Sequence, residues 1–155
     1  KVNPPLRGAS DVEALRAALA DGTIDVVATD HAPHPVEAKQ AAWGDAAMGM
    51  VGLETALAVV QESMVETGLL DWAGVARVMA STPARIGRLD GFGGPIEVGA
   101  PAHLALVDPS GRTPIDAERL HGRSTNSPFL GRTLPGRVVH TVYRGRVTVQ
   151  DGVVA

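Results

Sequence analysis

Apolar residues in the first part of the chain follow helical spacing in several segments and form one continuous, strand-like run. The run over residues 24–28 has the length and the β-branched residues of a strand that is buried on both faces. Around it, apolar residues recur every three or four positions, which is the spacing of an amphipathic helix. These helical segments cover residues 10–21, 53–65 and 72–79, and a further short stretch begins at Ser81 with Pro83 in its first turn. The order helix, strand, loop, helix, helix predicts an α/β architecture.

Local signals set the expected ends of these elements. Ser10 is the expected N-cap of the first helix, with Glu13 completing a capping box, and Gly22 is expected to end it. Residues 35–49 lose any apolar periodicity and mix small with charged residues. We therefore expect a long loop there, of a length that is typical of functional loops.

From residue 91 onward the sequence pattern changes and predicts short strands between Gly and Pro turns. The expected strands cover residues 102–107, 137–143 and 147–149, with turns at 144–146 and 151–152. The sequence therefore predicts two domains. Residues 1–90 form an α/β part, and residues 91–155 form a small, β-sandwich-like part.

Composition excludes several classes of protein. The 155 residues contain no cysteine, so neither a disulfide framework nor a thiolate metal site is possible, and a cytoplasmic location is expected. A net charge of -3 and 3% aromatic residues argue against nucleic-acid binding. The chain has no run of about 18 apolar residues, so no membrane span is expected.

The chemistry is concentrated where the strand-like run ends, at Asp30, His31 and His34. A carboxylate at the end of a barrel strand can ligate a divalent metal ion and move the proton of a water molecule. The alternative is that Asp30 caps a turn and both histidines are simply exposed. Pro33 makes a continuing helix improbable and places His34 on a loop above the strand end, which favours the metal hypothesis.

Chain length limits what this part can be. A complete (β/α)8 barrel needs about 250 residues, and only residues 1–90 precede the β-rich part. The sequence is therefore consistent with the last strand-and-helix units of an incomplete barrel. A small, self-sufficient α/β domain is the alternative.

Three motifs carry a family resemblance. They are Lys-Val-Asn-Pro-Pro-Leu-Arg at 1–7, Ala-Thr-Asp-His-Ala-Pro-His at 28–34 and Gly-Met-Val-Gly-Leu-Glu-Thr at 49–55. In this order they resemble the carboxy-terminal portion of the long-chain bacterial dihydroorotases of the amidohydrolase superfamily. Asn-Ser-Pro-Phe-Leu-Gly at 126–131 is similar to the part of these enzymes that completes a small β domain beside the barrel.

The resemblance implies roles for individual residues. Asp30 matches a zinc ligand that also acts as general base and acid, in a site that holds two zinc ions. Asn3 and His34 match residues that contact the substrate. Met48 and Gly49 match a substrate-contacting pair that is usually Phe-Gly, so a backbone contact is expected where Met replaces the aromatic residue.

The implied reaction is the zinc-dependent, reversible cyclisation of N-carbamoyl-L-aspartate to L-dihydroorotate in de novo pyrimidine biosynthesis. The His-x-His motif and other zinc ligands of the family do not occur in this chain. We therefore expect the chain alone to be inactive, to bind zinc poorly and to need the amino-terminal remainder of a barrel. A homodimer and a complex with aspartate transcarbamoylase are possible partnerships for this family.

Two other functions fit the same motifs. Related allantoinases and dihydropyrimidinases carry similar strand-end acids, and an inactive dihydroorotase-like chain can serve as a scaffold for aspartate transcarbamoylase. The remaining histidines have no match to family ligands, and structural roles are expected for His31, His103, His121 and His140.

Overall fold

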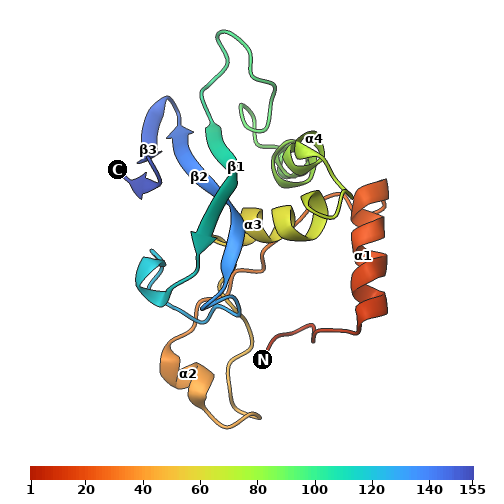
Figure 1. Cartoon of the computed structure of the whole chain (residues 1–155), viewed down its shortest axis with the longest axis vertical. Helices are drawn as coiled ribbons and strands as arrows, with labels where there is room; N and C mark the ends of the chain where they lie inside the picture. Colours follow the sequence, from red (N-terminus) through yellow and green to blue (C-terminus); the bar gives the residue numbers. More distant parts are fainter.

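A layer of helices packs beside one antiparallel sheet in the computed structural model, which describes every residue from Lys1 to Ala155 (Figure 1). The helices are α1 (Ala9–Asp21), α2 (Val36–Gln40), α3 (Ala56–Val60), η1 (Gln61–Val65), α4 (Trp72–Ala76), η2 (Arg77–Ser81), α5 (Thr82–Gly87) and η3 (Ala117–Arg119). The strands are β1 (Leu104–Pro114), β2 (Thr133–Tyr143), β3 (Arg146–Gln150) and β4 (Val153–Val154).

The four strands form a meander in the order β1-β2-β3-β4, with antiparallel neighbours throughout. This chain therefore supplies a single sheet, and the expected sandwich-like second layer is absent from it. Strand β1 extends past its expected end at residue 107. Pro109, Ser110 and Gly111, which suggested a turn, lie in a bulge between Asp108 and Arg112, and the strand continues beyond it. Pairing then resumes, with Thr113 opposite Leu134.

The helices share one apolar core that joins α1, η1, α4 and η2. Its buried residues are Leu19, Val60, Met64, Val75 and Val78. The two longer helices predicted from apolar spacing are confirmed, with α3–η1 starting at Ala56 and α4–η2 continuing into α5. Pro83 occupies the first turn of α5, as predicted.

Contacts between the helices and the sheet fix their relative position. Helix α3 packs against β2. Gln61, which is buried in η1, donates a hydrogen bond from Nε2 to the carbonyl oxygen of Pro109 in the β1 bulge at 2.8 Å. Arg132, in the loop before β2, forms an ion pair with Glu62 of η1 at 2.8 Å. This ion pair holds the loop before β2 against η1.

Three expectations about local structure are wrong. Ser10 lies inside α1, whose N-cap is Gly8, although Gly22 does end the helix with a φ of 88°. The loop predicted over residues 35–49 contains α2. Residues 24–28 form no strand, because no neighbouring strand in this chain can bond to them. The amide of Val27 instead donates to the carbonyl oxygen of Val78 at 3.1 Å.

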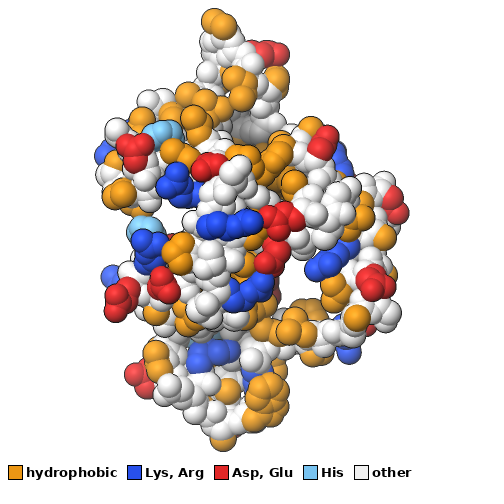
Figure 2. Space-filling view, in the orientation of Figure 1, with side chains coloured by type: hydrophobic (Ala, Val, Ile, Leu, Met, Phe, Trp, Pro, Cys, Tyr) orange, Lys and Arg blue, Asp and Glu red, His pale blue; other side chains and the backbone are white.

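The chain exposes more surface than a folded monomer of its mass. Its accessible surface is 10231 Å², whereas a monomer of 16.0 kDa is expected to expose roughly 7,400 Å². Only 15 residues are buried. Two segments project from opposite ends of the molecule, one around α2 and the other between α5 and β1 (Figures 1 and 2). No helix is both long and apolar enough to span a membrane.

Candidate active site

Asp30 ends the extended segment in an unusual backbone conformation. Its φ is 46°, in the left-handed region that residues other than glycine rarely adopt. The side chain is exposed and makes no hydrogen bond or ion pair within the chain. Strained backbone of this kind concentrates at functional sites, where a side chain must be held in one direction. The geometry therefore marks Asp30 as a chemically available carboxylate on a constrained turn.

The residues after Asp30 lie beside the segment that precedes α3. His31 forms an isolated parallel bridge with Met50, and the amide of Ala32 donates to the carbonyl oxygen of Met50 at 2.9 Å. The Nδ1 atom of His31 accepts the backbone N–H groups of Gly52 and Leu53 at 3.1 and 3.3 Å. The ring of His31 thus fastens the turn that leads into α3, which supports the expected structural role.

His34, Met48 and Gly49 meet at one point. The Nε2 atom of His34 lies 2.8 Å from the carbonyl oxygen of Met48. Gly49 has a φ of 128°, and a Cβ there would collide with the Cβ of Ala32 and lie 3.2 Å from His34 Nε2. Glycine is therefore required for this close approach. Three of the residues predicted to contact substrate are brought together.

The first residues of the chain border the same point. The amide of Gly49 donates to the carbonyl oxygen of Lys1 at 2.9 Å. Lys39 donates from Nζ to the carbonyl oxygens of Lys1, Ala47 and Gly49 at 3.3, 2.8 and 2.8 Å. Asn3 is two residues from this contact, but its side chain is exposed and makes no hydrogen bond. The structure therefore does not bond Asn3 to the group formed by His34, Met48 and Gly49.

Lys39 lies in a loop that resembles the one bordering the family's site, but the sequence assigned no role to Lys39 or to Asn126. Each contacts the carbonyl oxygen of Gly49, and Asn126 also contacts Ala32 and His34. Asn126 is far from the other residues in sequence, so spacing could not assign it. The one available signal was its place in the Asn-Ser-Pro segment, because an asparagine in such a loop is often held for its side-chain bonds.

Asp30 is the predicted zinc ligand, and its carboxylate has no competing partner in the chain. The structure contains no group of three or more His, Asp or Glu side chains that could hold a metal. His103 stacks on Phe92 with ring centroids 4.0 Å apart, and His140 lies 3.8 Å from Asp151. Both histidines therefore lie in the β-rich part, and each has a contact partner there.

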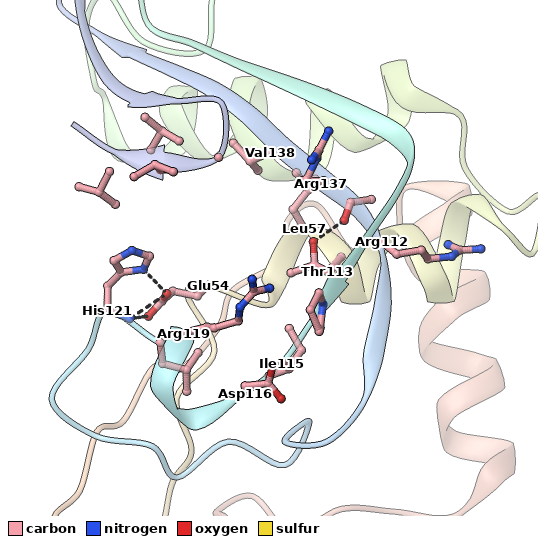
Figure 3. A pocket seen from close by; sticks show the side chains of 18 of the residues that line it. Glu54, Leu57, Arg112, Thr113, Ile115, Asp116, Arg119, His121, Arg137 and Val138 are labelled. Atoms are coloured by element: carbon pink, nitrogen blue, oxygen red, sulfur yellow. Dashed lines mark hydrogen bonds and ion pairs between the residues drawn. The ribbon is translucent and has the colours of Figure 1, made fainter.

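A hollow of about 770 Å³ lies elsewhere, between α3, η3 and the sheet (Figure 3). None of the five predicted site residues lines it. Glu54 and His121 face each other at its rim, with Glu54 Oε2 2.9 Å from Nδ1 of His121 (Figure 3). The carboxylate also accepts the backbone N–H of His121 at 3.0 Å and of Gly122 at 3.3 Å.

These contacts change the acidity of Glu54. Partial burial by itself raises the pKa of the carboxyl, but the hydrogen bonds from His121 and Gly122 outweigh it, so the pKa is lowered from its ordinary value. Glu54 thus fastens the loop that follows η3 to the turn that precedes α3. This loop continues to Asn126.

Comparison with known proteins places these motifs in a family. The chain is similar to the dihydroorotase of Leifsonia xyli subsp. xyli, with 64% identity over 154 residues that cover 99% of this chain and 35% of that protein. It is 62% identical to the dihydroorotase of Streptomyces coelicolor, over 98% of this chain and 36% of that protein. The chain thus spans about a third of the length of these relatives. The predicted resemblance to dihydroorotases is confirmed.

Solved structures agree on the fold. The L-hydantoinase (dihydropyrimidinase) from Arthrobacter aurescens matches with a TM-score of 0.90 and 35% identity, over 100% of this chain and 35% of that one. The D-hydantoinase (dihydropyrimidinase) from a Thermus species matches with a TM-score of 0.89 and 30% identity, over 99% of this chain and 34% of that one. The amidohydrolase family model matches residues 3–148. The chain therefore belongs to the amidohydrolase family.

Proposed function

We propose that this chain forms one wall of a dihydroorotase active site. The reaction is the reversible interconversion of N-carbamoyl-L-aspartate and L-dihydroorotate, in the synthesis of pyrimidines. The observation that carries the proposal is that Asp30 stands free on a strained turn next to the joined segments of His34, Met48 and Gly49. Identity of 64% to a dihydroorotase over nearly the whole chain supports this substrate class.

In the hydrolytic direction, water attacks the amide carbonyl carbon of the ring and the C–N bond of the ring breaks. Asp30 takes the proton of the attacking water and returns it to the departing nitrogen. In the biosynthetic direction the same carboxyl moves the proton back, a C–N bond forms and water leaves. A bound zinc ion lowers the pKa of water from about 15.7 to roughly 7, which makes hydroxide available near neutral pH.

The other residues bind and orient the substrate. The ring Nδ1 of His34 has no partner in the chain, so it is the atom of this side chain that is available to a ligand. At the Met48–Gly49 pair the amide of Gly49 is bonded to Lys1, whereas the amide of Met48 has no partner. The expected backbone contact to substrate is therefore assigned to the Met48 N–H. Asn3 supplies a further amide from the neighbouring segment.

We propose that the amino-terminal remainder of a longer polypeptide completes the site. Residues 1–90 would form the last strand-and-helix units of its (β/α)8 barrel, and residues 91–155 would form part of a β domain. The surplus exposed surface and the unpaired segment over residues 24–28 support this proposal. The remainder would supply the further ligands that two zinc ions require, since Asp30 is one ligand. A cytoplasmic location, a homodimer and a complex with aspartate transcarbamoylase remain predictions.

A second candidate is a hydantoinase or dihydropyrimidinase, because structures with these names share the fold at 30–35% identity. The test is to express the complete polypeptide with zinc and to measure hydrolysis of L-dihydroorotate, dihydrouracil, hydantoin and allantoin. We expect turnover of L-dihydroorotate to exceed that of the other three amides. Preference for another amide would assign that activity instead, and no turnover of any would support a scaffold.

A further inference from the structure

Asn126 joins three segments of the chain around the candidate active site. Its Oδ1 accepts the backbone N–H of His34 at 3.3 Å. Its Nδ2 donates to the carbonyl oxygens of Ala32 and Gly49 at 3.0 and 3.2 Å. Its own carbonyl oxygen accepts the N–H of Val51 at 3.2 Å. One residue from the β-rich part is therefore bonded to both segments that carry the predicted substrate contacts.

The contacts require an amide side chain. The carbonyl oxygens of Ala32 and Gly49 accept N–H donors here, and Gly49 also accepts from Lys39. The N–H of His34 needs an acceptor, and a carboxamide provides both functions from one carbon atom. An aspartate of the same shape keeps the acceptor but loses both donors, and places a negative charge beside two carbonyl oxygens. The side chain of Asn126 is partly buried, so water would not fully replace its hydrogen bonds if the amide were removed.

The loop that carries Asn126 is anchored at its beginning. Glu54 holds its beginning through His121 and Gly122. After Asn126, the Oγ of Ser127 accepts the N–H of Phe129 at 3.2 Å, within the loop itself. Asn126 thus projects from an anchored loop, whereas Ser127 makes only a local contact. The two neighbouring residues provide a matched variant and control.

We propose that Asn126 is a positioning residue that holds the His34 segment against the Met48–Gly49 segment and so sets the affinity for substrate. The proposal rests on the proposed function, because the two segments are assigned to substrate binding there. Asn126 makes no hydrogen bond with Asp30. Its loss should therefore weaken binding more than the chemical step, since binding that is equal in the ground and transition states appears in KM.

The test uses the complete polypeptide with zinc and compares Asn126→Asp, Asn126→Ala and Ser127→Ala. For both Asn126 variants we expect KM for L-dihydroorotate to rise at least about tenfold while kcat changes less than about threefold. Metal content should not change. Ser127→Ala should leave KM within about twofold of wild type, since it removes no bond to the two segments. An unchanged KM in the Asn126 variants would overturn the proposal.

Hydrogen exchange separates positioning from general destabilisation. We expect faster amide exchange over residues 31–34 and 48–51 in Asn126→Asp, with no change in α4, because only the joined segments lose bonds. Two results would overturn the proposal: faster exchange throughout the protein, or an unchanged exchange rate over residues 31–34 and 48–51. If the wild-type protein does not hydrolyse L-dihydroorotate, the proposed function fails together with the role in affinity. The exchange pattern then still shows whether Asn126 holds the segments.

Discussion

The ring of His34 and the backbone of Met48 are joined by a hydrogen bond of 2.8 Å between Nε2 and the carbonyl oxygen. A carbonyl oxygen can only accept, so this bond places a proton on Nε2. The two residues were predicted separately as substrate contacts. In the folded chain they form one unit, in which the ring holds the loop and leaves its Nδ1 atom free.

Replacing His34 separates these two tasks. Glutamine carries an Nε2 donor at a similar distance from the backbone, so His34→Gln should keep the bond to Met48, whereas His34→Ala removes it. Both variants lose Nδ1, and both should raise KM for L-dihydroorotate about tenfold in the complete polypeptide. Only His34→Ala should also reduce stability, by about 1 kcal/mol in chemical denaturation. A wild-type KM in either variant would remove His34 from the substrate site.

Gly49 should not tolerate any side chain. A Cβ would collide with Ala32 and crowd the ring of His34, and a φ of 128° is strained for alanine. Gly49→Ala should therefore destabilise the protein by about 1–3 kcal/mol and raise KM. Gly44 lies in the same loop with open space around it, so Gly44→Ala is the control and should be nearly neutral. Equal unfolding midpoints for the two variants would contradict this account of the loop.

The Glu54 contacts predict a pH dependence. Because the pKa is lowered in the fold, the stabilisation is present above the ordinary value of 4.5 and is lost as the pH falls through the lowered pKa. Glu54→Gln should cost about 0.5–1 kcal/mol at pH 7, a small value because the side chain is 37% exposed and screened by water. The difference from wild type should shrink below about pH 4.5 in urea denaturation.

The control for this experiment is Glu118→Gln, which alters an exposed carboxylate on η3 that makes no hydrogen bond or ion pair. It should leave stability unchanged at both pH values. A constant difference between wild type and Glu54→Gln across the pH range would show that the carboxylate charge is not the stabilising feature.

Sequence patterns predicted the helices well, because apolar residues at helical spacing form the core that joins α1, η1 and α4. They failed where the outcome depends on a neighbour. Residues 24–28 read as a strand, but a strand needs a partner for its backbone, and this chain provides none. Strand β1 was predicted too short, because the bulge that carries pairing past Pro109 depends on the register with β2.

The candidate site was predicted in part. The end of the strand-like run indicated Asp30 and His34, and the resemblance added Met48 and Gly49. The structure brings His34, Met48 and Gly49 together. Asn126 could not be assigned, because its bonds to Ala32, His34 and Gly49 span more than 75 residues of sequence. Such contacts are formed only when the β-rich part folds back onto the helical part.

The isolated chain should lack dihydroorotase activity. Asp30 is a single zinc ligand, and no cluster of three possible ligands exists in the structure. Adding zinc to the 155-residue chain should give weak binding in calorimetry and no turnover of L-dihydroorotate. Robust turnover by this chain alone would show that the site is complete without an amino-terminal remainder.

The most direct test of the central claim is kinetic analysis of Asp30→Asn in the complete polypeptide with zinc. Asparagine has the same shape and tolerates a φ of 46°, so folding should be preserved, with an unchanged unfolding midpoint. The amide cannot move a proton as the carboxylate does, so kcat for L-dihydroorotate should fall at least about 100-fold. Retention of wild-type kcat in a folded Asp30→Asn protein would contradict the assignment of Asp30 as the catalytic residue of this site.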